Sequence, residues 1–184
     1  MAGPAFDPNN AVRFDLNRGA ASDARGARLL VLPAAALEAI ERAHAPAVAA
    51  LGAEVGKACG AKVASRLGGD GGVRNAQLEV VVSHIAGELA VAGIGAIHVE
   101  RWGRAMVCVV SNSSTPSDGF LSAVLGGAIG AASGREVHAA PLGRDGNQIR
   151  FFIGTKATAE RVKGFVAQGK GFAEIVTTLQ RGGA

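Results

Sequence analysis

Glycines recur at intervals of four residues in two segments whose other residues predict helices. Gly52, Gly56 and Gly60 lie in one segment, and Gly126 and Gly130 lie in the other. A glycine in a helix interior costs about 1 kcal/mol relative to alanine, so another interaction must offset that cost. A four-residue interval puts the glycines on one helix face, where a second backbone can approach closely. We expect tight packing of these faces within the fold. The alternative is that Gly52, Gly56, Gly126 and Gly130 border a ligand channel or a dimer interface.

The composition predicts a folded domain with an unusual core. The chain has 184 residues, of which 48% are hydrophobic and only 4% aromatic. The hydrophobic fraction excludes a globally disordered chain, and the few aromatics require a core of Ala, Val, Leu and Ile. Residues 1–27 hold several Pro, Asn and Gly with little periodicity, which predicts a flexible N-terminal arm. Residues 28–184 then form a single domain.

Hydrophobic periodicity and turn residues predict helices that alternate with hairpins. A short strand over 28–32 ends at Pro33, and Pro46 interrupts the helical pattern that follows. The expected helices cover residues 34–45, 47–67, 74–91, 119–133, 158–168 and 172–180. The expected hairpins pair residues 96–100 with 104–110, and 135–140 with 148–154. The glycine-rich residues 68–72 are expected to be a loop. This order predicts an α+β fold with helices packed on an antiparallel sheet of two hairpins.

Charge and hydropathy narrow the range of partners. Nineteen basic and fifteen acidic residues give a formal net charge of +4. The excess is scattered rather than concentrated on one segment, so we do not expect nucleic-acid binding. The longest uncharged stretches, 105–117 and 119–134, fall short of the roughly 20 residues that a membrane span needs. The N-terminus lacks the pattern of a signal peptide, which predicts a cytoplasmic location.

No motif in the sequence carries a recognisable reaction. Cys59 and Cys108 are far apart and form no CxxC motif, and no two histidines have helical ligand spacing. The glycine-rich segments match neither a P-loop nor a dinucleotide-binding fingerprint, and no serine lies in a nucleophile elbow. We therefore predict no metal, no cofactor and no catalytic residues. A binding or assembly module is favoured over an enzyme.

An ordered set of motifs does resemble a known family. The motifs are the strand and proline at 28–33, Gly52 with Gly56, the Gly-hydrophobic-Gly run at 93–97, Gly126 with Gly130 before 134–137, and Gly146-Asn147 before Phe151-Phe152. Together they resemble the 4-vinyl reductase domain family, also called hydrocarbon-binding. That family is similar in fold to core subunits of the TRAPP vesicle-tethering complex. The resemblance covers roughly residues 28–165.

The resemblance implies a homodimer with an apolar pocket or channel. This sequence also departs from the family at two places where other members have functional cysteines. Many members have cysteines in the last hairpin that imply a metal site, whereas residues 141–152 contain none. TRAPP relatives can carry an acylated cysteine after the second helix, but residues 68–73 also lack one. The resemblance therefore implies neither a metal nor an acylation site here.

The leading interpretation is a non-catalytic homodimer that binds a hydrophobic small molecule, such as a lipid, isoprenoid, aromatic compound or tetrapyrrole. The helices at 47–67, 74–91 and 119–133 would line its pocket. The candidate lining residues are Leu78, Val82, Ile85, Phe120, Leu121 and Val124. Their alternative role is ordinary core packing. Two other functions stay open: a ligand-free scaffold that assembles through the glycine-rich helix faces, and an accessory enzyme of tetrapyrrole or lipid metabolism.

Overall fold

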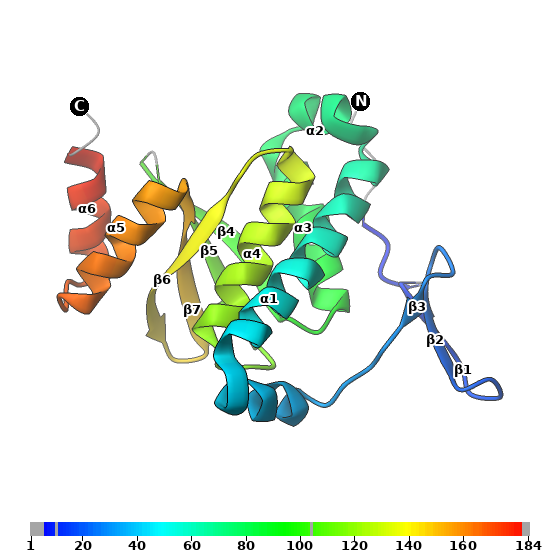
Figure 1. Cartoon of the computed structure of the whole chain (residues 1–184). Helices are drawn as coiled ribbons and strands as arrows, with labels where there is room; N and C mark the ends of the chain where they lie inside the picture. The colour runs from blue at the N-terminus through cyan, green and yellow to red at the C-terminus, as the bar shows by residue number, and fades with distance from the viewer. Residues whose placement is uncertain (1–5, 10, 104, 182–184) are drawn as a thin grey trace.

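Helices enclose an antiparallel sheet in the computed structural model, which describes residues 6–9, 11–103 and 105–181 (Figure 1). These residues form seven strands and six helices. The strands are β1 (Val12–Asp15), β2 (Ala20–Asp23), β3 (Arg28–Leu29), β4 (Ala96–Trp102), β5 (Ala105–Ser111), β6 (His138–Asp145) and β7 (Gln148–Gly154). The helices are α1 (Ala34–Arg66), α2 (Gly69–Asn75), α3 (Leu78–Val91), α4 (Asp118–Ser133), α5 (Lys156–Ala167) and α6 (Phe172–Arg181).

The two predicted hairpins form one four-stranded sheet in the order β4-β5-β7-β6, with every neighbouring pair antiparallel. The second hairpin thus joins the first through its last strand, which places β5 and β7 in the centre. Cys108 on β5 lies opposite Val99 on β4 and Phe151 on β7. The predicted α+β class, with helices on an antiparallel sheet of two hairpins, is confirmed.

The sheet separates two hydrophobic cores, because successive side chains of a strand point to opposite faces. On β5, Cys108 and Val110 join the core beneath α1, α3 and α4, whereas Val107 and Val109 join the core beneath α5 and α6. The apolar helix α4 is buried in the first core. Among the described helices, none is both long enough and apolar enough to cross a membrane.

Close contact between α1 and α4 explains the glycine spacing. A Cβ atom added at Gly52 would lie 2.7 Å from the Phe120 carbonyl oxygen, and one at Gly56 would overlap the Val124 carbonyl oxygen. The fit is reciprocal, because a Cβ at Gly127 of α4 would lie 2.6 Å from the Ala53 carbonyl oxygen. Gly52 and Gly56 are buried in this contact. The expectation of tight packing within the fold is confirmed for these positions.

The α4 glycines Gly126 and Gly130 face a different neighbour. Added Cβ atoms there would lie 3.0 Å from the Val137 carbonyl oxygen and 3.1 Å from the Arg135 carbonyl oxygen. These carbonyls belong to the chain that leaves α4 and enters β6. The glycines therefore let this connecting segment run close along α4.

Several predicted elements differ from the structure. The strand expected over 135–140 instead runs over His138–Asp145, because its pairing with β7 begins at His138 and continues to Asp145. Residues 68–72 were expected to be a loop, but Gly69–Asn75 forms the short helix α2. The turn between α1 and α2 is confined to Gly68 and Gly69, whose φ values of +88° and +76° reverse the chain direction there. The helix expected from residue 74 begins at Leu78, because Ala76 and Gln77 are extended. The strand expected over 28–32 stops at Leu29, where its pairing with β2 ends.

The prediction of an interruption near Pro46 is confirmed. His44 has φ −158° and ψ 77°, which kinks α1. A proline ring clashes with the carbonyl four residues before it, so a helix cannot pass through that position unchanged.

The segment expected to be an arm contains regular structure. Strands β1, β2 and β3 form a separate antiparallel sheet, in which Phe14 pairs with Ala21 and Ala21 pairs with Leu29. The chain then runs through exposed residues to α1 (Figure 1). The flexibility of this arm and the domain boundary at residue 28 stay predictions. Residues 1–5 and 10 of the arm lie outside the described residues.

The packing predicts opposite effects for two Gly→Ala substitutions. Gly56→Ala should lower the free energy of unfolding by about 2 kcal/mol or more, because the new methyl group meets a backbone carbonyl that cannot move alone. Gly164→Ala is the matched control, since no atom lies within 4 Å of an added Cβ at that exposed position of α5. It should raise the free energy of unfolding by up to about 1 kcal/mol. Urea unfolding of both variants measures the difference, and equal effects would contradict the packing argument.

Candidate functional site

An open groove lies along the outer side of α1 and α4 and is bounded by β6 and α5. Its volume is about 820 Å³. Small residues dominate its lining: Ala49, Ala53, Gly119, Ala123, Gly126, Gly127, Gly130 and Ala131. The groove follows α4 from Asp118 to Ala131, a distance of about 20 Å at 1.5 Å per residue. The site is therefore an elongated trough with a floor of backbone and methyl groups.

One polar atom in the groove lining has no protein partner. The Ser122 hydroxyl oxygen is buried and makes no hydrogen bond with the described residues. A buried hydroxyl without a partner costs free energy, because it has given up its bonds to water. A molecule in the groove could restore that hydrogen bond.

The charged side chains near the groove rim are mostly engaged with one another. The pairs are Lys57–Glu54 at 2.6 Å, Lys163–Glu160 at 2.8 Å, His138–Glu136 at 2.8 Å and Arg144–Asp118. The hydrogen bond from His138 lowers the pKa of Glu136, and the hydrogen bond from Lys163 lowers the pKa of Glu160. Exposed pairs of this kind contribute little to stability. These charged pairs lie at the rim, so the apolar surface of the groove is mainly its floor of alanines and glycines.

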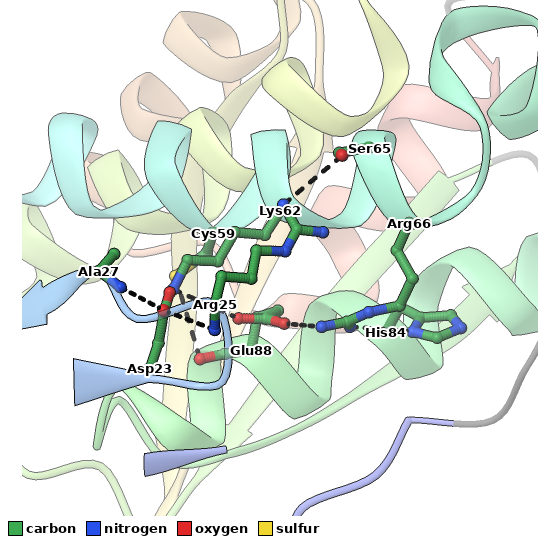
Figure 2. A network of polar contacts seen from close by, with 9 residues as sticks. All are labelled: Asp23, Arg25, Ala27, Cys59, Lys62, Ser65, Arg66, His84 and Glu88. Carbon is green, nitrogen blue, oxygen red and sulfur yellow. Dashed lines mark hydrogen bonds and ion pairs between the residues drawn. The ribbon is translucent and has the colours of Figure 1, made fainter. Parts of the chain in front are cut away.

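A second candidate site is a cluster of polar and charged side chains, which we name the charged joint. Its members are Asp23, Lys62, Arg66, His84 and Glu88 (Figure 2). The Lys62 ammonium lies 2.8 Å from Asp23 and 4.0 Å from Glu88. Arg66 lies 2.6 Å from the Glu88 carboxylate and 3.3 Å from His84 Nδ1. The joint thus connects the end of β2 with α1 and α3.

The carboxylates of the charged joint are buried but compensated. Asp23 is 7% exposed and Glu88 is 6% exposed, and each lies beside at least one cation. The hydrogen bond from Lys62 holds the pKa of Asp23 below its usual value. Because its pKa is lowered, Asp23 is not poised for proton transfer near neutral pH. Both carboxylates are held in ion pairs. In the part of the chain that the structure describes, no group of three His, Cys, Asp or Glu could hold a metal ion.

Both thiols are shielded from solvent. Burial raises the pKa of Cys59 to about 11 and the pKa of Cys108 to about 12. Cys59 lies beside the charged joint, with its sulfur 3.9 Å from the Glu88 carbonyl oxygen, and Cys108 lies in the sheet. Nucleophilic chemistry needs the thiolate, which is scarce at these pKa values.

The six residues predicted to bind a ligand do not line the groove. Ile85, Phe120, Leu121 and Val124 belong to the first core, and Leu78 and Val82 are half-buried on α3. Their role as ligand contacts stays a prediction. Of the four glycines predicted at an interface, Gly126 and Gly130 line the groove, and Gly52 and Gly56 lie in the α1–α4 contact. The role of all four at an interface between copies also stays a prediction.

The alanines beside the glycines are a sequence signal for the groove. Small residues extend beyond the glycines to Ala49 and Ala53 on α1, and to Ala123 and Ala131 on α4. Their spacing continues the faces that the glycines define. The charged joint had no such signal, because its residues come from three separate segments.

The comparison with solved structures bears on the fold. No protein-family model matches the chain, and no curated protein matches its sequence. A solved structure that does match is the crystal structure of the phenol-responsive sensory domain of the transcription activator PoxR with phenol. The two chains are 13% identical with a TM-score of 0.59, and the match covers 85% of this chain and 90% of that chain. At this identity the likeness shows a shared fold.

The raised pKa values predict two unreactive thiols in the native protein. At about pH 8, a pKa near 11 leaves about one thiolate in a thousand at Cys59, and even fewer form at Cys108. Iodoacetamide at that pH should modify both cysteines far more slowly in the native protein than in urea. Peptide mass spectrometry measures the two rates separately. Fast modification of either native thiol would contradict its burial.

Proposed function

We propose that this chain is a non-catalytic homodimeric module that binds a hydrophobic small molecule in the groove along α1 and α4. The observation that carries the proposal is the groove itself. Its volume of about 820 Å³ falls in the range of small-molecule sites, which are typically apolar with few polar groups. Ser122 supplies one such polar group on a floor of small apolar residues, and charged side chains such as Lys57 and Glu136 lie at the rim.

The shared fold supports the same function. The similar sensory domain is named for its response to phenol, an aromatic molecule of modest polarity. We propose a ligand of similar chemical character but greater length. A cavity of about 150 Å³ is enough for benzene, whereas this groove is several times larger and about 20 Å long. A molecule with several rings or an extended chain would fill it better than a single ring.

We also propose that the chain belongs to the 4-vinyl reductase domain family, as the motif resemblance implies, and that it acts in the cytoplasm. The proposal of a non-catalytic role is supported by the shielded thiols and by the paired carboxylates of the charged joint. No observation favours the alternative of an enzyme of tetrapyrrole or lipid metabolism.

Self-association is supported by the distribution of exposed apolar side chains. Of the nine exposed large hydrophobic side chains in the described part of the chain, seven lie between residues 14 and 51. They are Phe14, Leu16, Leu30, Val31, Leu32, Ile40 and Leu51. Concentrated exposed apolar residues mark interaction surfaces. We propose that a second copy of this chain covers them.

Native mass spectrometry of the purified protein, followed by organic extraction, tests whether an apolar molecule is bound. The site itself is tested by Ala53→Phe, which should fill the groove and weaken binding of 1-anilinonaphthalene-8-sulfonate by about tenfold or more. Ala50→Phe is the matched control, because Ala50 is an exposed residue of the same helix outside the groove lining. Fluorescence titration measures both affinities. Equal binding by the two variants would exclude the groove as the site.

The dimer proposal predicts a different pair of variants. Val31→Asp should shift the protein toward the monomer, because Val31 is 66% exposed in the apolar N-terminal region and a charge there resists burial. Val166→Asp introduces the same charge at an exposed valine of α5 and should leave the association state unchanged. Sedimentation velocity over a range of concentrations compares them. A wild-type monomer at all concentrations would contradict the proposal.

A further inference from the structure

The groove residues that α4 contributes form a regular line along one face of the helix, which we name the α4 track. Its members come in pairs from four successive turns: Asp118 with Gly119, Ser122 with Ala123, Gly126 with Gly127, and Gly130 with Ala131. The four-residue interval keeps them on one side of the helix. Beyond Ser122 the track holds only alanine and glycine as far as Ala131, a distance of about 14 Å at 1.5 Å per residue. The single hydroxyl group of the track therefore lies nearer to one end than to the other.

Ser122 differs from other hydroxyl residues in the helices of this chain. Ser133, Thr177 and Thr178 each donate a hydrogen bond to a backbone carbonyl three or four residues earlier. Such a bond commonly satisfies a serine or threonine within a helix. The Ser122 hydroxyl makes no hydrogen bond with the described residues, although its oxygen is buried. Because a serine side chain has three staggered rotamers, a change of rotamer can turn this hydroxyl toward a molecule in the groove.

The charged side chains around the groove offer a charged ligand no net attraction. The lining contains the cations Lys57, Arg135 and Lys163 and the carboxylates Asp118 and Glu136. The partners that pair with this lining from outside it are Glu54, Glu160 and Arg144. Together these residues amount to four positive and four negative charges, counted with His138 neutral. A charged group that left water for this groove would lose hydration without a net opposite charge to replace it, which favours an uncharged ligand.

We propose that the groove binds an uncharged, elongated molecule with a hydroxyl or carbonyl group near one end, held with that group at Ser122 and with its apolar tail along the α4 track toward Ala131. This inference rests on the proposed function and narrows its ligand class to long-chain alcohols, long-chain ketones and phenols with an extended substituent. A serine hydroxyl can donate a hydrogen bond to a carbonyl group, and it can donate to or accept from another hydroxyl. The tail gains free energy with each methylene group that it buries on the track.

The role of Ser122 is tested with two ligands that differ in one group. N-phenyl-1-naphthylamine, an uncharged apolar dye, reports occupancy of the groove by its fluorescence, and 1-decanol or 1-chlorodecane displaces it. Ser122→Ala should weaken the binding of 1-decanol about fivefold, because it removes one hydrogen bond to the ligand, and leave that of 1-chlorodecane within about twofold. Ser83→Ala is the matched control, since Ser83 is an exposed residue of α3 outside the groove lining. It should change neither affinity.

A second variant tests the direction of the tail. Val137 lines the far end of the groove beside Gly130, where an added Cβ atom would lie 4.0 Å from the Val137 Cβ atom. Val137→Phe should fill that end and weaken the binding of 1-decanol about fivefold, whereas 1-hexanol, whose tail is shorter, should stay within about twofold. Val166→Phe places the same ring at an exposed valine of α5 outside the lining, and it should change neither affinity.

The dye separates failure of this inference from failure of the proposed function. A wild-type protein that does not bind the dye would overturn both. If the dye binds, an equal effect of Ser122→Ala on 1-decanol and 1-chlorodecane, or no effect on either, would overturn the role of Ser122. An equal effect of Val137→Phe on 1-decanol and 1-hexanol, or none on either, would overturn the direction of the tail. Tighter binding of decanoate than of 1-decanol would overturn the assignment to an uncharged molecule.

Discussion

The backbone contact between α1 and α4 is the constraint on which the rest of the structure depends. Side chains at Gly52 or Gly56 would meet carbonyl groups of α4, so the two helices can approach only because these positions have none. The close packing of the two helices offsets the free-energy cost of placing glycines inside them. It also sets the depth of the groove, because two closely packed helices with small residues leave a trough beside them.

Helix α1 is shared by both candidate sites. Its residues Ala49, Ala53 and Lys57 line the groove, whereas Lys62 and Arg66 belong to the charged joint near its C-terminal end. The groove is apolar with a charged rim, and the joint is charged and largely closed to solvent. One helix therefore contacts the proposed ligand site and the N-terminal sheet, through different residues and different kinds of interaction.

The sequence predicted the fold better than the site, for a physical reason. Alternation identified both hairpins, and the four-residue glycine interval identified the faces that pack. Apolar periodicity also singled out residues such as Phe120 and Val124, which the structure places in the core. Periodicity shows that a helix face is apolar, but a core face and a pocket face have the same pattern. The groove instead lies over alanines and glycines, whose small side chains give no strong hydrophobic signal.

The sequence by itself determined the local elements, the α+β class and the need for close helix contacts, because hydrogen bonding and side-chain period act over a few residues. The tertiary structure decided which backbone each glycine meets and how the second hairpin joins the first. It alone brought Asp23, Lys62 and Glu88 together from three distant segments. Such a cluster depends on how whole elements pack, and each of its members by itself resembles an ordinary charged surface residue.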